Sequence, residues 1–551
     1  MTNRIRIALA QLNPIMGDLT GNLAKARAAR ASVPEADVIL YPELFITGYP
    51  TEDLVLKRAL QDDAREAVKS LAADTADGGP AVLMGTPWRE AGKLYNAVAY
   101  LEEGRIAART LKHDLPNYGV FDEKRVFSSG PLTGPLMVRG VRLGIPICED
   151  IWTPEVVGCM AETGAEILLV PNASPYEVGK EDVRLNMITA RVIESGLPMA
   201  YLNQVGGQDE LVFDGATLVV NADKTLAHAF PAWVEQTVIT DWHRENGVWV
   251  CAPGERVASE ERSQSVYHAM MLGLRDYVNK NRFSGVVLGM SGGIDSALSA
   301  AVAVDALGPT RVRCVMMPSR YTAQDSLDDA AECANLLGVS YETIPIETAV
   351  DAFATTLAPV FAGTKADTTE ENIQSRVRGL ILMALSNKFG PMVLTTGNKS
   401  EMSVGYATLY GDMCGGYNVL KDIYKMEVFR LCHWRNANMP SGAFGPQGRV
   451  IPERIITKPP SAELRDNQKD QDSLPPYEIL DGILECLVEQ EMAFEDVVAK
   501  GFDPAIVKRV EHLLYLSEYK RRQAPPGVKI GPRNFGRDRR YPITNAFRDA
   551  R

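Results

Sequence analysis

The chain has 551 residues, several times the usual size of one domain, so we expect two domains with separate cores. Hydrophobic residues make up 46% of it and charged residues 23%, and no apolar run is long enough to cross a membrane, so a soluble protein without a membrane partner is expected. A net charge of -12 disfavours sequence-independent binding to nucleic acid, which requires an excess of cations. The N-terminal segment lacks the features of an export signal, which predicts a cytoplasmic location.

Eight cysteines are scattered over the chain, without a CxxC pair and without a histidine at the spacing of a zinc ligand. A disulfide framework and a structural zinc site are therefore disfavoured. One stretch, residues 520–540, is rich in lysine and arginine among proline and glycine. A basic run of this kind is usually a solvated surface.

From residue 4 to about residue 250, short runs of valine, isoleucine and leucine alternate with amphipathic stretches, which is typical of an α/β domain. Residues 251–264 lose this periodicity and become charged and small, as an exposed linker does. We therefore predict two domains, residues 1–255 and residues 256–551. In the second, the apolar run SGVVLGM, a Gly-Ser loop and the helical stretch SALSAAVAVDALG predict the start of a doubly wound parallel sheet.

Three polar segments of the second half predict long loops: residues 361–372, 403–424 and 438–476. They are rich in glycine, proline or charged residues. Loops of this length in compact domains are usually lids, binding loops or disordered, so we expect at least one of them to be mobile.

Three reactive residues stand at the ends of predicted strands: Glu43 in VILYPELF, Lys112 in RTLKHDLP and Cys148 in LGIPICEDIW. The residues after Cys148 predict a helix, whose N-terminus would favour a thiolate. Glu43 suits a base that takes the thiol proton and returns it to leaving ammonia, and Lys112 suits stabilisation of an oxyanion. Taken alone, each residue also has a structural explanation, as a small buried side chain or a solvated turn residue.

The segments around these three residues resemble the carbon–nitrogen hydrolase, or nitrilase, superfamily over roughly residues 4–245. YPELF, LPNYGVFDE and ICEDIW follow one another in the family's order and at comparable spacing. The resemblance implies an αββα sandwich. It also implies that Glu43 is the proton acceptor, that Lys112 supports the oxyanion, and that Cys148 is the nucleophile that becomes a thioester.

Three further residues match positions that hold glutamine in the branch of this superfamily that serves NAD synthesis: Tyr118 in LPNY, Ser174 in PNASPY and Lys180 in EVGKED. Lys180 suits a pair with the α-carboxylate of glutamine, and the other two supply hydroxyl groups. Purely structural roles remain open for all three. Glu149 and Asp150, beside the cysteine, are alternatively helix-capping residues.

The segment SGGIDS, residues 291–296, follows an apolar strand and leads into a predicted helix. Its glycines let successive backbone N–H groups face a phosphate chain at the helix N-terminus. The segment lacks the GK[ST] ending of a Walker A loop. The carboxylate of Asp295 suits a magnesium ion, although Asp295 is equally a candidate helix cap.

SGGIDS resembles the pyrophosphate loop of the ATP pyrophosphatases, which split ATP between the α and β phosphates and activate an oxygen as an AMP ester. The resemblance implies an adenine nucleotide alpha hydrolase-like domain with ATP as co-substrate and Mg2+ as cofactor. The residues implied to bind ATP in and around the loop are Gly289, Met290, Ser291, Gly292, Gly293, Ile294, Asp295 and Ser296.

Two blocks further along, TTEENIQSRVRGLILMALSN and LTTGNKSEMSVGYATLYGDMCGGYNVLKDIYK, are similar to the NAD synthetases. With the loop, the similarity covers most of residues 265–430. The similarity implies that Glu371 binds magnesium together with Asp295, and that Thr396 binds ATP. It also implies that Asn372, Glu401 and Lys520 bind deamido-NAD+, and that Lys399 binds a phosphate. Ordinary helix-surface charge is the alternative for the two glutamates.

The two resemblances together imply that ATP, glutamine and deamido-NAD+ react to give NAD+, AMP, pyrophosphate and glutamate, with ammonia passed through a tunnel. They also imply a homo-oligomer, a dimer through the C-terminal domain that can assemble further into an octamer. Two alternatives stay open. One is a glutamine-dependent ATP pyrophosphatase that acts on a nucleotide base or a tRNA, against which the absence of a broad basic surface argues. The other is a non-catalytic scaffold, which trapping of a thioester at Cys148 would exclude.

Overall fold

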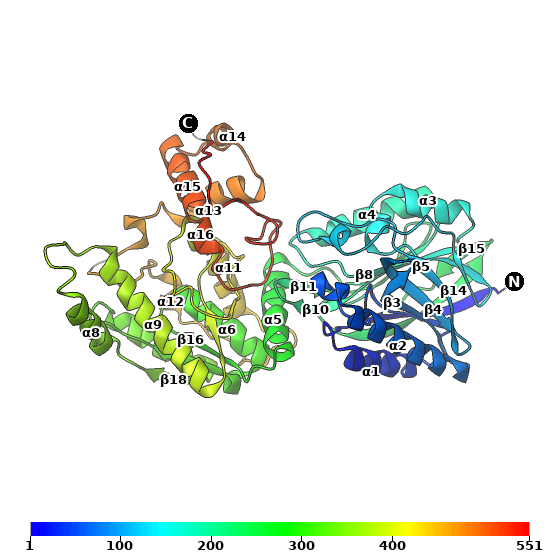
Figure 1. Ribbon diagram of the computed structural model, residues 1–551, viewed down its shortest axis with the longest axis horizontal. Coiled ribbons are helices and arrows are strands. Elements are labelled where there is room, and N and C mark those ends of the chain that lie inside the picture. Colours follow the sequence, from blue (N-terminus) through cyan, green and yellow to red (C-terminus); the bar gives the residue numbers. More distant parts are fainter. Residues whose placement is uncertain (1, 467, 550–551) are drawn as a thin grey trace. The chain divides into compact units, whose positions relative to one another are not determined.

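The computed structural model describes residues 2–466 and 468–549 of the chain. The chain divides into two compact units, Met1–Glu260 and Glu261–Arg551, which are drawn in Figure 1. The boundary predicted after residue 255 lies in the segment between β15 (Val248–Cys251) and α5 (Arg262–Lys280). No helix in the described part of the chain is both long enough and apolar enough to cross a membrane.

The first unit contains a seven-stranded mixed sheet, in the order β15-β14-β1-β2-β3-β4-β5. In chain order its strands are β1 (Arg4–Gln11), β2 (Val38–Leu40), β3 (Ala81–Glu90), β4 (Lys93–Glu102), β5 (Arg105–Leu111), β14 (Gln236–Glu245) and β15 (Val248–Cys251). The strand β1, third in this order, is parallel to β2 and antiparallel to β14. The crossover from β1 to β2 is made by α1 (Leu19–Ala31), and the next crossover contains α2 (Arg58–Asp74).

A second, six-stranded sheet of the same unit has the order β13-β12-β9-β8-β7-β6. Its strands are β6 (Leu136–Val138), β7 (Val141–Gly144), β8 (Ile167–Asn172), β9 (Met199–Asn203), β12 (Leu218–Val220) and β13 (Leu226–Ala229). The helices α3 (Pro154–Glu162) and α4 (Lys180–Ser195) connect β7 to β8 and β8 to β9. The strands β10 (Val205–Gln208) and β11 (Leu211–Asp214) form a separate hairpin.

Three buried clusters show how these layers pack. Alternate residues of β1 point to opposite sides: Ile5, Ile7 and Leu9 pack against apolar residues of β7, β8 and β9, whereas Ala8 and Ala10 pack against α1 and α2. A third cluster joins the other face of the six-stranded sheet to α3 and α4. This period of two follows from the strand geometry. The unit is therefore an αββα sandwich, as predicted.

The second unit is built on a five-stranded sheet, in the order β18-β17-β16-β19-β20, in which every pair is parallel. Its strands are β16 (Val286–Gly289), β17 (Val312–Met316), β18 (Ser340–Thr343), β19 (Met392–Thr395) and β20 (Tyr417–Asn418). The order reverses at β16, so the C-terminal ends of β16 and its neighbours flank a topological switch point, where ligands bind in such sheets. The predicted doubly wound parallel sheet is confirmed.

Figure 1 shows the helices of the second unit. They are α5 (Arg262–Lys280), α6 (Ile294–Leu307), α7 (Gln324–Leu337), α8 (Glu347–Leu357), α9 (Thr368–Phe389), α10 (Lys399–Val404), α11 (Lys425–Ala437), α12 (Glu453–Thr457), α13 (Tyr477–Leu484), α14 (Phe494–Ala499), α15 (Pro504–Leu516) and α16 (Glu518–Arg521). Apolar residues of α8 and α9 pack on β16, β17 and β19. A separate cluster joins α13, α14 and α15.

The ion pair between Arg435 of α11 and Asp305 of α6 is fully buried, with both side chains 0% exposed. Arg435 donates from Nε at 2.6 Å and from Nη2 at 3.0 Å, and the Tyr267 hydroxyl donates to the same carboxylate at 2.6 Å. Arg435→Met leaves the buried carboxylate without its cation. We expect this to lower the free energy of unfolding of the second unit by about 3–5 kcal/mol.

The loss is measured as faster amide hydrogen exchange in α6 and α11. Arg449→Met is the matched control, because Arg449 pairs with Glu332 at 3.1 Å with half of each side chain exposed, and such pairs contribute about 0–1 kcal/mol. Equal effects of the two substitutions would contradict the prediction.

Candidate active sites

The three residues predicted to react in the first unit come from the ends of strands in both sheets. Glu43 follows β2 and Lys112 follows β5 of the seven-stranded sheet, while Cys148 lies beyond β7 of the six-stranded sheet. The sandwich therefore brings together residues that are far apart in the sequence. All three side chains are buried, with Glu43 and Lys112 at 0% exposed and Cys148 at 5%.

Lys112 lies between two buried carboxylates. Its Nζ donates to Glu43 Oε1 at 2.7 Å and to Glu123 at 2.8 and 3.0 Å. Asn96 donates to Glu43 Oε1 at 2.7 Å, and the Ala173 N–H donates to Oε2 at 3.2 Å. Burial lowers the pKa of Lys112, but the carboxylates raise it to a net value well above the ordinary one. Lys112 is therefore a fixed positive charge at neutral pH.

Glu123 is a residue that the sequence did not single out, although it lies within the quoted segment LPNYGVFDE. Besides Lys112 it binds the Tyr49 hydroxyl, at 2.9 Å. Burial raises the pKa of Glu123, and Lys112 opposes this shift. Its contact with Lys112 could be recognised only from the fold, because a glutamate after a turn usually faces solvent.

The predicted stabilisation of a Cys148 thiolate by a helix N-terminus is wrong. Burial raises the pKa of the Cys148 thiol well above its usual range, and Glu43 adds to this effect, while Lys112 opposes it. Cys148 begins a short 3-10 helix, Cys148–Ile151, and not an α-helix. The thiol is therefore neutral and needs a base.

Cys148 also has a left-handed backbone, with φ at 47°. This conformation is unfavourable for a residue with a Cβ, and strained residues of this kind gather at active sites. It occurs at a sharp turn between the segment after β7 and the 3-10 helix. The turn presents the thiol beside Glu43 and Lys112, both of which act electrostatically on it.

Of the three residues predicted to hold glutamine, Tyr118 and Lys180 are connected by a series of contacts to Glu149, which adjoins Cys148. The Tyr118 hydroxyl donates to Glu149, the neighbour of Cys148, at 3.0 and 3.1 Å. The rings of Tyr118 and Phe121 pack edge to face at 5.5 Å, and Lys180 Nζ lies 5.8 Å from the Phe121 ring. Tyr118 is half exposed, and it lies between Glu149 and Phe121 in this series of contacts.

Ser174 is buried and tightly held. Its hydroxyl accepts from Arg184 Nε at 3.2 Å, and its backbone N–H donates to Asn203 at 2.9 Å. Arg184 is itself fixed by Asp214, at 2.7 Å. Ser174 is therefore positioned by a buried network, and a contact with glutamine stays a prediction.

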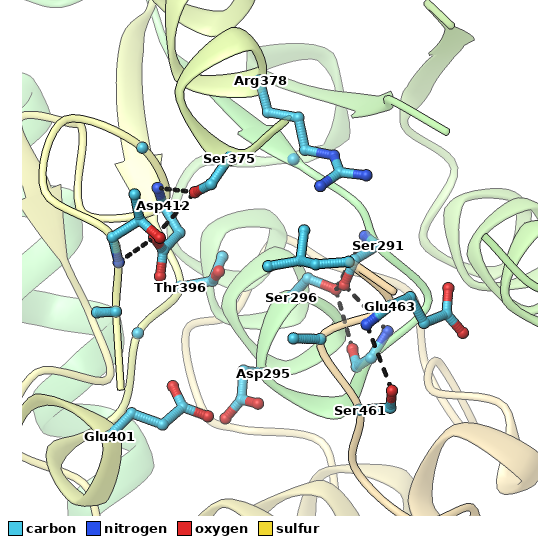
Figure 2. Close-up of a pocket in the computed structure, with 18 of the residues that line it drawn as sticks. Ser291, Asp295, Ser296, Ser375, Arg378, Thr396, Glu401, Asp412, Ser461 and Glu463 are labelled. Atoms are coloured by element: carbon cyan, nitrogen blue, oxygen red, sulfur yellow. Dashed lines mark hydrogen bonds between the residues drawn. The ribbon is translucent and has the colours of Figure 1, made fainter. Parts of the chain in front are cut away.

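In the second unit, a cavity of about 690 Å³ opens above the C-terminal end of the parallel sheet. Figure 2 shows Ser291, Arg378 and Thr396 among the residues around it. The predicted residues in its wall are Gly289, Met290, Ser291, Gly293, Ile294, Asp295, Ser296, Glu371, Asn372, Thr396, Glu401 and Lys520. The structure thus brings residues from four parts of the sequence to one cavity.

Gly292 is the predicted loop residue that does not line this cavity. It has a left-handed φ of 76°, and a Cβ at this position would lie 2.3 Å from the backbone oxygen of Ser326. Only glycine fits such a close approach. Gly292 therefore shapes the loop, whereas its neighbours face the cavity.

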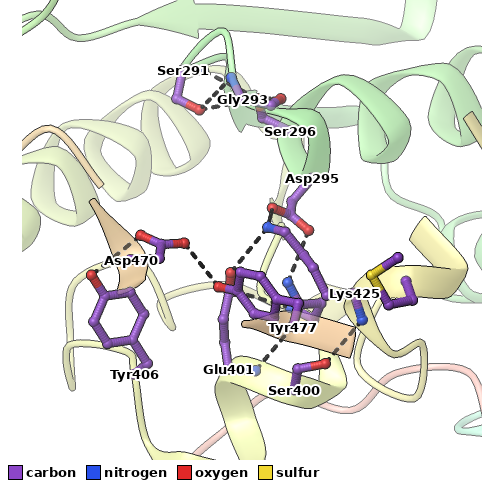
Figure 3. A network of polar contacts seen from close by, with 12 residues as sticks. Ser291, Gly293, Asp295, Ser296, Ser400, Glu401, Tyr406, Lys425, Asp470 and Tyr477 are labelled. Atoms are coloured by element: carbon purple, nitrogen blue, oxygen red, sulfur yellow. Dashed lines mark hydrogen bonds and ion pairs between the residues drawn. The ribbon is translucent and has the colours of Figure 1, made fainter. Parts of the chain in front are cut away.

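Lys425 is a second residue that sequence reasoning missed. Its Nζ forms ion pairs with Asp295 and, at 3.3 Å, with Glu401 (Figure 3). Asp295 is predicted to bind ATP and magnesium, and Glu401 to bind deamido-NAD+. Asn398 also donates to Asp295, at 2.9 Å. Lys425 begins α11 at the end of the quoted block DIYK. Nothing in the sequence alone distinguishes it from other lysines at helix starts.

Lys399 does not have its predicted place at a phosphate. It is 0% exposed, it is absent from the cavity wall, and it is paired with Asp422 and Glu489. Its Nζ also donates to the backbone oxygen of Arg533 at 2.8 Å. A buried lysine of this kind needs such partners, so Lys399 connects α10 to the C-terminal segment.

Lys520 and Asn372 both reach the cavity. Lys520 Nζ donates to the backbone oxygens of Gly405 and Ala407, each at 2.7 Å. The Asn372 side chain accepts from Thr408, at 2.8 Å. Both residues thereby hold the loop that follows α10, and their contacts with deamido-NAD+ stay predictions.

Comparisons with known proteins agree with this two-site architecture. Residues 6–254 match the carbon-nitrogen hydrolase family and residues 266–524 match the NAD synthase family. The chain is 55% identical over 551 residues to a glutamine-dependent NAD+ synthetase from Rhodobacter capsulatus, with 100% of both chains covered. It is 50% identical to a protein of the same name from Xanthomonas campestris pv. campestris, with 98% of each chain covered.

Among solved structures, the glutamine-dependent NAD+ synthetase from Acinetobacter baumannii in complex with ADP is similar, with 42% identity, a TM-score of 0.78 and 99% of each chain covered. The glutamine-dependent NAD+ synthetase from Cytophaga hutchinsonii has the same fold, with a TM-score of 0.82 at 23% identity over 98% of each chain. The similarity to these proteins extends over both units. The chain therefore belongs to the family of glutamine-dependent NAD+ synthetases.

Proposed function

We propose that this chain makes NAD+ from deamido-NAD+, ATP and glutamine, with AMP, pyrophosphate and glutamate as the other products. The observation that carries the proposal is the presence, on one chain, of the buried group Glu43, Lys112 and Cys148 and of a cavity with an SGGIDS loop in its wall. The first group suits release of ammonia from an amide. The second suits activation of a carboxylate by ATP.

In the first reaction, Glu43 takes the proton of the neutral Cys148 thiol as the sulfur attacks the amide carbon of glutamine. The charge of Lys112 stabilises the oxyanion that forms. Glu43 then gives the proton to the leaving nitrogen, and ammonia departs. Water, deprotonated by Glu43, hydrolyses the thioester to release glutamate and restore the thiol.

In the second reaction, the carboxylate of deamido-NAD+ attacks the α-phosphate of ATP, and pyrophosphate leaves. Ammonia then attacks the adenylated carboxyl carbon, and AMP leaves. Backbone N–H groups of the SGGIDS loop and of the start of α6 suit binding of the phosphates. Thr396 suits a contact with ATP, and Asn372, Glu401 and Lys520 suit binding of deamido-NAD+.

The cavity wall favours a cation together with the nucleotide. Its carboxylates outnumber its lysines and arginines: Asp295, Asp325, Glu371, Glu401, Asp412, Glu463 and Asp470 stand against Arg378, Lys425, Lys458 and Lys520. In the described residues no group of three or more metal-ligating side chains gathers. Magnesium fits this donor set, since it commonly binds one or two carboxylates together with phosphate oxygens. Asp295 and Glu371 would hold it, and it would neutralise the polyphosphate.

The proposal also includes a homo-oligomer, a dimer through the second unit or a larger assembly, which mass photometry of the purified chain measures. The reaction itself is tested by incubating the chain with ATP, magnesium, glutamine and deamido-NAD+, and by following NAD+ formation. Stoichiometric NAD+ and AMP are expected. Hydrolysis of glutamine without NAD+ formation would show that another acceptor is adenylated.

Glu43→Gln is expected to lower the rate of glutamine hydrolysis by about 10²–10⁴-fold, because the base is lost. The same substitution is expected to lower the pKa of the Cys148 thiol, since the Glu43 charge is one cause of its raised value. The enzyme would thus gain thiolate and still lose activity. The pH dependence of Cys148 alkylation by iodoacetamide, read by peptide mass spectrometry, measures the pKa.

Glu235→Gln is the matched control, because Glu235 also pairs with a lysine, Lys25 at 2.7 Å, but near the surface. It is expected to change neither quantity. If Glu43→Gln hydrolysed glutamine at the rate of the unaltered chain, Glu43 would not be the base.

A further inference from the structure

Asp150 is a buried carboxylate that the proposed reaction does not use. It is 1% exposed and it accepts three hydrogen bonds, all from backbone N–H groups. The donors are His113 at 3.0 Å and Asp114 at 2.7 Å, both to Oδ1, and Ile147 at 2.9 Å, to Oδ2. The helix-capping role left open for Asp150 describes only the third of these bonds.

The three N–H donors to Asp150 adjoin two of the reactive residues of the first unit. His113 and Asp114 directly follow Lys112, and Ile147 directly precedes Cys148. The Lys112 segment leaves the seven-stranded sheet, and the Cys148 segment leaves the six-stranded sheet. One carboxylate group therefore links the backbones that carry the oxyanion-stabilising cation and the nucleophile.

Neighbouring contacts make this link stiff. The Gly130 N–H donates to the backbone oxygen of Lys112 at 2.7 Å, and the His113 ring nitrogen Nδ1 lies 2.7 Å from the Gly130 oxygen. Thr153 Oγ1 donates to the Asp114 carboxylate at 2.9 Å, which joins the same two segments again. We call the three hydrogen bonds of Asp150 to the backbones of His113, Asp114 and Ile147 the Asp150 clamp. The left-handed residue Cys148 lies between Ile147 and Asp150, inside this clamp. A strained turn persists only where its surroundings fix it in this way.

We propose that Asp150 is a positioning residue for glutamine hydrolysis: by binding backbone N–H groups beside Lys112 and beside Cys148, it fixes the cation relative to the sulfur. The inference rests on the proposed function of the first unit. Asp150 contacts neither glutamine nor the sulfur in this role. Its removal lets the two segments move apart, and a displacement of about 1 Å can cost roughly 10²-fold in rate.

Asp150→Asn is the sharpest variant, because it keeps the size of the side chain. An asparagine has one acceptor oxygen, so its NH2 group must face either the Ile147 N–H or the N–H groups of His113 and Asp114. One half of the clamp is therefore lost. We expect kcat for glutamine hydrolysis to fall by about 10–10²-fold, with KM for glutamine changed by less than about 2-fold, and Asp150→Ala to lose more.

Asp37→Asn is the matched control. Asp37 also caps a backbone N–H of the first unit, that of Arg6 at 2.7 Å, but it directly precedes β2, whereas Glu43 follows that strand. The control is expected to retain its kcat, and all variants are expected to make NAD+ from ammonium at the rate of the unaltered chain. The fraction of folded protein, measured by thermal unfolding, corrects each kcat.

A kcat per folded molecule that is unchanged in Asp150→Asn would overturn the inference and leave Asp150 a stabilising residue only. A rise in KM with an unchanged kcat would overturn it as well, since it would place Asp150 in substrate binding. Absence of glutamine hydrolysis in the unaltered chain would instead contradict the proposed function, so the two failures are distinguishable.

Discussion

Cys148→Ala is expected to abolish NAD+ formation from glutamine, by roughly 10⁴-fold or more, and to leave NAD+ formation from ammonium intact. Without the sulfur no thioester can form, and no other nucleophile adjoins Glu43 and Lys112 among the contacts described for them. The adenylating cavity is built entirely from residues of the second unit, so it keeps its geometry. The assay is NAD+ formation with either nitrogen source at saturating ATP.

The matched control is Cys159→Ala, which removes another free thiol of the same unit, on α3. It is expected to retain both activities. Equal loss of the glutamine-supported and the ammonium-supported reaction in Cys148→Ala, with the protein folded, would contradict the division of labour between the two sites.

Gly292→Ala is expected to lower kcat/KM for ATP by about 10²-fold or more with either nitrogen source, and to leave glutamine hydrolysis unchanged. A Cβ at residue 292 would lie 2.3 Å from the Ser326 backbone oxygen, and backbone atoms cannot rotate aside. The left-handed φ of 76° adds about 1 kcal/mol or more of strain. The loop must therefore shift, and its backbone N–H groups no longer point toward the phosphates of ATP.

Gly363→Ala separates the two causes. Gly363 also has a left-handed φ, of 84°, but nothing lies within 4 Å of a Cβ built there. It carries the strain without the clash, and we expect kcat/KM for ATP to stay within about 2-fold of the unaltered value. Steady-state kinetics with ATP varied checks both variants. An unaltered kcat/KM in Gly292→Ala would show that the loop tolerates the methyl group and is not rigid.

The fold could be predicted because its signals are local and periodic. Apolar strands alternate with amphipathic helices in both halves, and the Gly-Ser loop after β16 marks a strand–loop–helix turn that the structure has, with α6 starting at Ile294. The sequence motifs around Glu43, Lys112 and Cys148 are enough to predict that these three residues react. The structure then places the three side chains together, although each follows a different strand.

What the sequence could not reveal depends on contacts between distant segments. Lys399 lies in a block typical of the family, yet its ammonium is paired with Asp422 of the same block and with Glu489 of a later segment. Lys425 looks like an ordinary residue at a helix start, yet it pairs with Asp295 and Glu401.

The state of Cys148 likewise depends on burial, which outweighs the helix N-terminus that the sequence suggested. A helix of four residues has little dipole to offer. Sequence patterns report which residues are available for chemistry. The pKa values of those residues are set by neighbours that only the fold brings close.

The most direct test of the account follows the nitrogen atom. The unaltered chain is given deamido-NAD+, ATP, magnesium, glutamine labelled with ¹⁵N in its amide, and unlabelled ammonium, and the NAD+ formed is analysed by mass spectrometry. We expect NAD+ to carry ¹⁵N in its carboxamide, and Cys148→Ala to make only unlabelled NAD+ from the same mixture. Unlabelled NAD+ from the unaltered chain while it consumes glutamine, or labelled NAD+ from Cys148→Ala, would contradict this expectation.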